Sequence, residues 1–220
     1  MSQHDIAPLL ATAQAHLAAL DPRWKRLIDR VGDSRLTTEQ NRSPFEALSR
    51  AVAFQQLHGK AASAIVGRLV ERFPGQTFPT PAQLAALADE ELRRCGFSAR
   101  KAATLKAIAD AAVKGQIPTR DAAVAMDDEA LIERFTALKG IGRWTVEMLL
   151  IHTLGRADIL PVDDFGVRDG ARYLFAWQRM PTPTETRRLC EPCRPYRSVA
   201  SWYLWRCNEL SDYRRLERAK

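Results

Sequence analysis

Apolar residues recur with the period of an α-helix along most of this chain, and no other feature constrains the fold as strongly. In "KAASAIVGRLVERF" (60–73) they occupy one helical face, at Ala62, Ile65, Val66, Leu69, Val70 and Phe73. This i, i+3, i+4, i+7 spacing is typical of a helix packed on a core. Other segments with helical patterns are 44–57, 99–115, 127–138, 143–154, 164–176 and 196–210. Long alternating patterns typical of strands are missing, so the sequence predicts an all-α protein.

The predicted helices form two groups along the 220 residues. Residues 40–155 read as one continuous helical lobe with short connections that contain proline or glycine. Helices from residue 164 onward must cover their apolar faces, and those near the N-terminus are the natural partners. We therefore expect a second lobe made of residues 1–39 and 156–220, with a central cleft between the two lobes.

Charge favours a polyanionic partner. The chain has 33 Lys+Arg against 26 Asp+Glu, a net charge of +7 and a pI near 9.5. Basic proteins of this kind often bind nucleic acid, although many bind none. No apolar run approaches the ~18 residues of a membrane span. The N-terminus lacks the features of a signal peptide, so we expect a cytoplasmic protein without a membrane partner.

The cysteines do not predict a metal centre. Cys190 and Cys193 have the C-x-x-C spacing of zinc and redox sites, but only Cys207 follows them, and no histidine does. Their spacing also differs from that of a four-cysteine iron–sulfur loop. In a reducing compartment we expect free thiols of no catalytic role.

The segment "LKGIGRW" (138–144) interrupts two predicted helices with two glycines. Gly140 and Gly142 can adopt positive φ values and let another molecule approach the backbone, while Ile141 can anchor the turn in the core. The N–H groups at the start of the next helix form an anion site. The residues expected to contact a DNA phosphate here are Lys139, Gly140, Gly142 and Arg143. A second phosphate contact is expected where a helix begins, at Ser98, Arg100 and Lys101.

The combination of segments resembles the helix-hairpin-helix DNA glycosylase superfamily, and within it the 3-methyladenine DNA glycosylase II group. The segments that carry the resemblance are "AVAFQQLHGKAA" (51–62), "GFSARKAATLKAIA" (96–109), "LKGIGRWTVEMLL" (138–150), "LPVDDFGVR" (160–168) and "RPYRSVASWYLWR" (194–206). The resemblance implies two helical lobes in the compact form, which lacks the N-terminal β domain of larger members. It also implies duplex DNA as the partner.

The resemblance assigns the chemistry to Asp164. Cleavage of an N-glycosidic bond builds positive charge on the sugar, and a carboxylate near C1′ stabilises that charge. The neighbouring Asp163 is expected to cap the helix that begins there and so to fix the direction of Asp164. The alternative is that both carboxylates serve only as caps.

The resemblance places Trp144 and Trp205 in the base pocket, where aromatic faces attract a cationic alkylated base. Met148 stands where larger members carry tyrosine. Trp202 is a further pocket candidate, and core packing is an equal alternative for it. Bifunctional relatives carry a nucleophilic lysine at the position of Trp144. The tryptophan therefore predicts a monofunctional enzyme that leaves an abasic site.

Three further roles follow from the resemblance. Leu57 is the wedge that fills the gap left by the flipped base, and His58 probes the minor groove. The backbone carbonyls of the hairpin are expected to hold a Na⁺ or K⁺ ion, with no other cofactor and no iron–sulfur cluster. The residues that would supply these carbonyls are Thr136, Leu138 and Gly140.

The sequence thus predicts a monomeric base-excision repair enzyme, of a bacterial type associated with the nucleoid. It hydrolyses alkylated purines such as 3-methyladenine and 7-methylguanine from double-stranded DNA. Two alternatives stay open at this point: a glycosylase of the same superfamily for oxidised or mismatched bases, and a non-catalytic helix-hairpin-helix DNA-binding module. Trp144 argues against the first, and the "PVDD" loop with its aromatic residues argues against the second.

Overall fold

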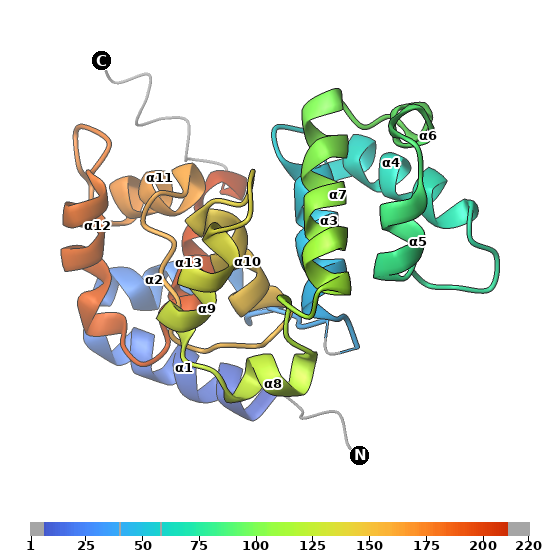
Figure 1. Ribbon diagram of the computed structural model, residues 1–220. Helices are drawn as coiled ribbons and strands as arrows, with labels where there is room; N and C mark the ends of the chain where they lie inside the picture. The colour runs from blue at the N-terminus through green and yellow to red at the C-terminus, as the bar shows by residue number, and fades with distance from the viewer. Residues whose placement is uncertain (1–6, 40, 58, 211–220) are drawn as a thin grey trace. The chain divides into compact units, whose positions relative to one another are not determined.

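The computed structural model describes residues 7–39, 41–57 and 59–210, and the regular elements in these ranges are all helical (Figure 1). The predicted all-α class is therefore confirmed. The chain divides into two compact units. Residues 39–154 form one, here called the central unit, and residues 1–38 with 155–220 form the other, the terminal unit. The lobe boundaries expected from the sequence differ from these by one residue.

The central unit contains eight of the described helices: α3 (Pro44–Phe54), α4 (Gly59–Glu71), α5 (Pro81–Ala86), α6 (Asp89–Cys95), α7 (Ala99–Val113), α8 (Arg120–Ala125), α9 (Asp128–Thr136) and α10 (Arg143–His152). Helix α3 packs against α4, α7 and α10, while α5 covers α7 and α9 covers α10. Leu48 and Val52 on α3, Leu105 on α7 and Leu150 on α10 are fully buried in this core. Helices α3 and α10 thus share a core. Residues 55–57 follow directly after α3, and residues 138–144 lead into α10.

The periodicity of residues 60–73 identified the buried face of α4 correctly over most of its length. Ala62, Ile65, Val66 and Leu69 are buried. The helix ends at Glu71, before the predicted end at residue 73, and Phe73 is only half-buried. The chain turns at residues 72–76, where Gly75 has a φ of +81°, so the turn ends the helical pattern early.

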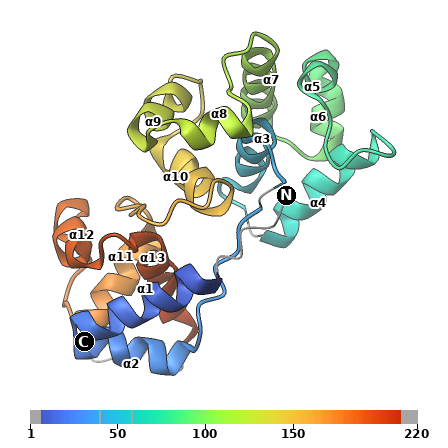
Figure 2. The ribbon, with the colours of Figure 1, turned by 90° about the horizontal axis from the view of Figure 1, so that it is seen from below.

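The terminal unit contains α1 (Ala7–Leu20), α2 (Pro22–Val31), α11 (Phe165–Leu174), α12 (Pro183–Cys190), α13 (Arg197–Arg206) and two short 3-10 helices, Glu191–Cys193 and Cys207–Glu209. Helix α13 lies at its centre and contacts α1, α2 and α11 (Figure 2). Residues 197–204 are all buried. The Tyr203 hydroxyl donates a hydrogen bond to the Gly32 carbonyl at 3.1 Å, which connects α13 to the residue that follows α2.

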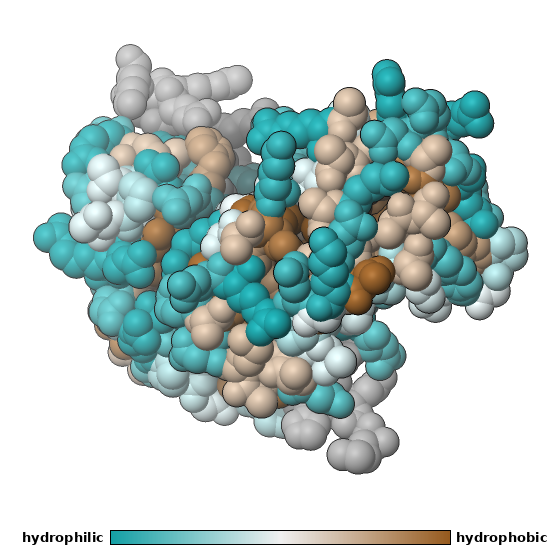
Figure 3. Space-filling model, viewed as in Figure 1, coloured by the Kyte–Doolittle hydropathy of each residue, from teal (hydrophilic) through white to brown (hydrophobic). Residues whose placement is uncertain are grey.

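Most helices begin at a residue whose side chain accepts a backbone N–H. Examples are Asp21 for α2, Ser43 for α3 and Ser98 for α7. Such caps satisfy donors that the first helical turn leaves open. On the face shown in Figure 3, hydrophilic residues predominate and strongly apolar residues occur in small separate areas. Among the described residues, no helix has the length and apolar character needed to cross a bilayer.

Candidate active site and nucleic-acid interface

The two glycines of the hairpin between α9 and α10 differ in backbone conformation and in the space around them. Gly140 has a φ of +88°, and a Cβ there would collide with the side chain of Thr104 on α7. Gly142 has a φ of −97° and a ψ of 165°, and a Cβ there would meet no atom within 4 Å. The expectation of a positive φ therefore holds for Gly140 and is wrong for Gly142. Ile141 is buried and anchors the turn as predicted.

Gly142 is the N-cap of α10, where no side chain caps the helix among the residues described. The backbone at Gly142 lies open on the side where a Cβ would project. Helix N-termini with such an arrangement attract anions. Lys139 next to it is exposed. The geometry around Gly142 is thus compatible with the close approach of a phosphate.

Arg143 has two carboxylate partners within the protein. Its guanidinium donates to both oxygens of Glu129, at 2.9 and 2.5 Å, and to Glu147 at 3.1 Å. The hydrogen bonds to Glu129 raise the pKa of Arg143 above its usual value. The charge of Arg143 is therefore balanced locally, and a phosphate contact by this residue stays a prediction.

The turn after α3, which carries Leu57, is tied to both α7 and the hairpin. Lys101 donates from Nζ to the carbonyls of Ala53 and Gln55, at 2.8 and 2.7 Å. Gln55 donates from Nε2 to the Gly140 carbonyl at 3.3 Å. Gln56 has a φ of +56°, and Leu57 stands 40% exposed beyond it. The exposed leucine is thus presented by a turn with fixed ends.

This role of Lys101 could not be deduced from the sequence, which suggested a phosphate contact. The last carbonyls of a helix lack intrahelical partners, and the ammonium satisfies two of them at the end of α3. Burial of the ammonium lowers the pKa of Lys101. Ser98 caps α7 by accepting the Lys101 N–H at 3.3 Å, and Arg100 is exposed. His58, the predicted minor-groove residue, lies outside the described residues.

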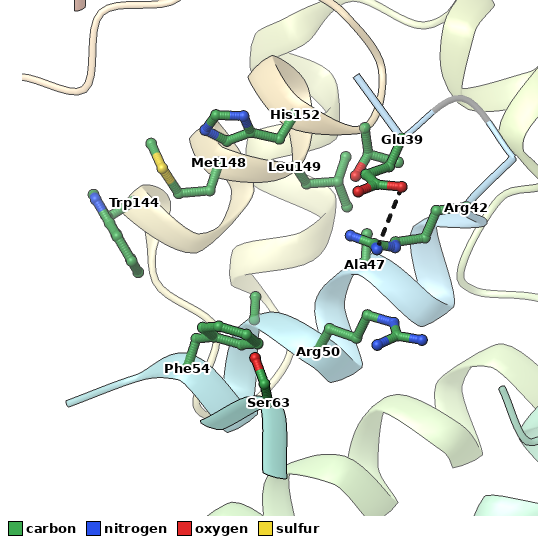
Figure 4. Close-up of a pocket in the computed structure, with 12 residues that line it drawn as sticks. Glu39, Arg42, Ala47, Arg50, Phe54, Ser63, Trp144, Met148, Leu149 and His152 are labelled. Atoms are coloured by element: carbon green, nitrogen blue, oxygen red, sulfur yellow. Dashed lines mark ion pairs between the residues drawn. The ribbon is translucent and has the colours of Figure 1, made fainter. Parts of the chain in front are cut away.

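The central unit contains a pocket of about 480 Å³ between α3, α4 and α10 (Figure 4). Trp144 and Met148 both line it, as do Phe54 and His152, which sequence reasoning missed. A signal for His152 was available, because positions 144, 148 and 152 share one helical face. Phe54 gives no comparable signal, because an apolar residue at a helix end usually belongs to the core.

The charged residues at the far side of this pocket balance one another. Arg42 lies 3.6 Å from Glu39 and 3.7 Å from Glu46, and Arg50 lies 2.7 Å from Glu46. The Arg50 guanidinium also stacks on the Phe78 ring at 5.0 Å. Two carboxylates and two guanidinium groups therefore leave this side without a large net charge.

Asp164 begins α11 in the terminal unit, and its carboxylate is held by two N–H donors. Val167 donates its backbone N–H and Trp205 its indole N–H to the same oxygen, Oδ1, each at 2.8 Å. Asp164 is thus the N-cap of α11, and the prediction that Asp163 caps this helix is wrong. Asp163 is exposed. The carboxylate of Asp164 thus lies at the first turn of α11, where its capping oxygen is held in one direction.

Two glycines on α11 allow this contact with Trp205. A Cβ at Gly166 would lie 2.8 Å from Trp205 Cδ1, and one at Gly170 would collide with the backbone carbonyl of Leu204. Both glycines face α13, because they are four residues apart on one helix. The i, i+4 glycine spacing in "FGVRDG" was the sequence signal for this close packing. Either glycine alone would not indicate such packing.

Trp202 is 8% exposed and packs edge-on against Tyr203, with ring centroids 5.0 Å apart. The guanidinium of Arg206 lies over the Trp202 ring, with Cζ 5.4 Å from the ring centroid. These contacts match the core-packing alternative for Trp202. Its pocket role stays a prediction.

The hairpin carbonyls are chemically suited to an alkali cation. The Leu138 carbonyl accepts the Ile141 N–H at 3.1 Å, and the Gly140 carbonyl accepts from Gln55. A carbonyl oxygen has two lone pairs, so each can also serve a cation. In the described part of the chain, no group of three or more His, Cys, Asp or Glu side chains could hold a metal. Cys190, Cys193 and Cys207 are buried free thiols.

The chain matches the HhH-GPD superfamily base excision DNA repair protein over residues 49–195. It is 46% identical to DNA-3-methyladenine glycosylase 1 of Schizosaccharomyces pombe, over 99% of this chain and 96% of that protein. The structure of an S. pombe 3-methyladenine DNA glycosylase in complex with abasic DNA superposes with a TM-score of 0.87 and 47% identity, covering 92% of this chain and 98% of that one. A DNA-3-methyladenine glycosidase from Bacillus halodurans gives 0.79 and 33%, covering 94% of each chain. The chain therefore belongs to the HhH-GPD superfamily of base excision DNA repair proteins.

Proposed function

We propose that this protein is a monofunctional DNA glycosylase that releases alkylated purines, such as 3-methyladenine and 7-methylguanine, from double-stranded DNA. The observation that carries the proposal is the carboxylate of Asp164, half-buried and oriented by Val167 and Trp205. The proposal is also supported by the similarity of nearly the whole chain to DNA-3-methyladenine glycosylase 1 of S. pombe.

Asp164 would act on the sugar. As the base departs, positive charge develops at C1′, and a carboxylate held nearby stabilises that charge. The two N–H donors restrain the direction of the carboxylate, because both bind the same oxygen. The same carboxylate can orient the attacking water. An alkylated purine is already cationic, so the leaving group needs no strong general acid.

The monofunctional character rests on Trp144. An indole has no amine that could attack C1′, so the reaction would end at an abasic site without strand cleavage. Lys139 is exposed on the hairpin, on the other side of Gly140 and Gly142 from Trp144. We assign it to a DNA phosphate and not to chemistry at the sugar.

The remaining assignments concern DNA. Leu57 would enter the space that the flipped base vacates, and the N–H groups at Gly142 would bind a backbone phosphate. A Na⁺ or K⁺ ion held by carbonyls of Thr136, Leu138 and Gly140 would add positive charge beside that phosphate. No other cofactor and no iron–sulfur cluster is proposed. The active species would be a monomer, located with the DNA.

The test is release of base from duplex DNA that carries one 7-methylguanine. The free base and the abasic sites are both measured. Asp164→Asn keeps a side chain that can cap α11 but removes the charge, so we expect a loss of more than about a hundredfold in single-turnover rate. Asp163→Asn is the matched control, since the neighbouring carboxylate is exposed, and it should stay close to wild type. Equal effects of both variants would exclude the catalytic assignment. Strand cleavage without added base would exclude the monofunctional one.

A further inference from the structure

Lys101 on α7 makes two of the hydrogen bonds that close the turn after α3. Its ammonium donates to the carbonyls of Ala53 and Gln55, at 2.8 and 2.7 Å. The carbonyl between them, that of Phe54, accepts the N–H of Leu57 at 3.3 Å. Three successive carbonyls at the end of α3 are therefore satisfied, and two of them use one side chain from another helix. A cation at a helix C-terminus is also favoured by the helix dipole.

The turn has a backbone conformation that needs such support. Gln56 has a φ of +56°, in the left-handed region that a residue with a side chain rarely adopts. Gln56 and Leu57 are both exposed, so packing in the core does not hold them. A backbone of this kind persists where the surrounding structure determines it. The two hydrogen bonds from Lys101 end directly before Gln56, so they hold the chain where it changes direction.

Helix α7 supports the hairpin as well as this turn, and it packs against α3 (Figures 1 and 2). Lys101 and Thr104 are three residues apart on α7, so they lie on the same side of the helix. The side chain of Thr104 lies against Gly140, where it fills the space of a Cβ. Gln55 donates to the Gly140 carbonyl at 3.3 Å. The position of Leu57 relative to the hairpin is therefore set through α7.

We infer that Lys101 is a positioning residue for the wedge: it holds the turn in the conformation from which Leu57 enters the DNA. This inference rests on the proposed function, which assigns Leu57 to the space that the flipped base vacates. Insertion of a side chain must offset the cost of taking a base out of the stack. A side chain that is held in place beforehand loses less conformational freedom on insertion than one on a mobile turn. In this role Lys101 acts through the backbone of the turn and not by contact with the reacting atoms.

The surroundings of Lys101 also separate this role from a phosphate contact. An ammonium has three N–H donors, and two carbonyls already accept from this one. The side chain is half-buried. A lysine that binds a phosphate contributes to the salt dependence of DNA binding, whereas a lysine that holds a turn does not. The two roles therefore predict different results for the same substitution.

The first test follows insertion of the wedge without catalysis. The probe is a duplex with an uncleavable abasic-site analogue opposite 2-aminopurine, whose fluorescence rises when this base loses its stacking. Lys101→Met keeps the length of the side chain and removes its N–H donors. At saturation it should give a smaller rise than wild type, with an unchanged slope of log affinity against log salt concentration. A slope reduced by about one would indicate a phosphate contact and overturn the inference.

The matched control is Lys106→Met. Lys106 lies on the same helix, α7, with its Nζ 3.5 Å from Asp89. This variant removes the same charge from the helix and leaves the turn after α3 unchanged, so its fluorescence rise should equal that of wild type. An equal reduction in both lysine variants would mean that the overall charge of α7, and not the turn, determines insertion.

The second test is a double-mutant cycle with Leu57→Ala, read as single-turnover release of 7-methylguanine. Lys101→Met should reduce the rate by about tenfold when Leu57 is present, and by less than about twofold when the wedge has already been removed. The same loss in both backgrounds would indicate a merely structural role and overturn the inference. Lys101→Gln keeps an N–H donor and should have a smaller effect. It takes the place of Lys101→Met if far-UV circular dichroism shows that the methionine variant does not fold.

The two tests together distinguish this inference from the proposed function. If wild type released no base but raised the 2-aminopurine fluorescence in a way that required both Lys101 and Leu57, the proposed activity would fail and the role of Lys101 would stand. If wild type released base and Lys101→Met equalled it in both tests, the activity would stand and the role of Lys101 would fail.

Discussion

The two units hold their candidate functional residues in opposite ways. In the terminal unit, Asp164 is fixed by two N–H donors to one oxygen, and the helices around it are in contact through glycines. In the central unit, Trp144, Phe54 and Leu57 are each more than a third exposed, and Lys101 holds the backbone next to Phe54. A charge that must face one atom needs a fixed direction, whereas surfaces that meet a polymer need exposed area.

The comparison predicts that the terminal unit tolerates added volume least. Gly170→Ala places a methyl group against the Leu204 carbonyl, so α11 and α13 must separate, and we expect a loss of about 3 kcal/mol in the free energy of unfolding. Urea denaturation measures it. The control is Gly67→Ala on α4, where a Cβ meets no atom within 4 Å and helix propensity should add stability of up to about 1 kcal/mol. A neutral Gly170→Ala would show that the two helices are not closely packed.

A smaller change removes the indole N–H of Trp205 and keeps an aromatic side chain. Trp205→Phe deletes the indole N–H that binds Asp164, and a hydrogen bond to a charged group contributes about 1.5–3 kcal/mol. We expect the single-turnover rate of base release to fall by about tenfold or more, with DNA affinity unchanged. Trp202→Phe, which alters an indole on the same helix, is the comparison. If both variants had the same rate as wild type, orientation of Asp164 by Trp205 would be disproved.

Some features of this molecule can be predicted from the sequence, and others depend on how its helices pack. Helical periodicity, the buried Ile141 and the all-α class follow from local pattern, because they depend on neighbours within a few residues. Asp164 and Trp205 are 41 residues apart. Their hydrogen bond, like the one from Lys101 to α3, depends on how helices pack. Residue type alone suggested a capping role for Asp163, which Asp164 has instead. It suggested phosphate binding for Lys101 and gave no sign of its hydrogen bonds to the carbonyls of Ala53 and Gln55.

The hairpin glycines allow a third test, in which stability and DNA binding separate. Gly140→Ala must take a positive φ and displace Thr104, so it should cost about 2 kcal/mol of folding free energy. Gly142→Ala has an accessible φ and open space, so it should cost less than about 1 kcal/mol. Its methyl group would nevertheless obstruct a phosphate, so we expect weaker binding to duplex DNA at unchanged thermal stability. Fluorescence anisotropy with a labelled duplex checks it, and unimpaired binding would remove Gly142 from the interface.

The smallest effect concerns pH and separates two similar helix starts. Asp21 caps α2 and Ser43 caps α3, each before a proline, but only Asp21 titrates. The hydrogen bonds from Arg23 lower the pKa of Asp21 from 3.8 to about 2. The carboxylate therefore contributes stability above pH 4, and this contribution is lost as the pH falls through 2. Since the pair lies near the surface, less than about 1 kcal/mol is at stake.

Asp21→Ser keeps a capping oxygen and removes the titration. The melting temperature of this variant should fall less between pH 4 and pH 2 than that of wild type. An identical pH dependence in both proteins would mean that other carboxylates account for the acid sensitivity of this unit.

The capping hydrogen bond gives Asp164 a structural role that does not depend on catalysis. The residue starts α11 whether or not any DNA is present, so folding alone is a reason to retain it. A descendant that had lost base cleavage would still benefit from an aspartate at this position. An aspartate at this position in a relative therefore does not by itself indicate an enzyme.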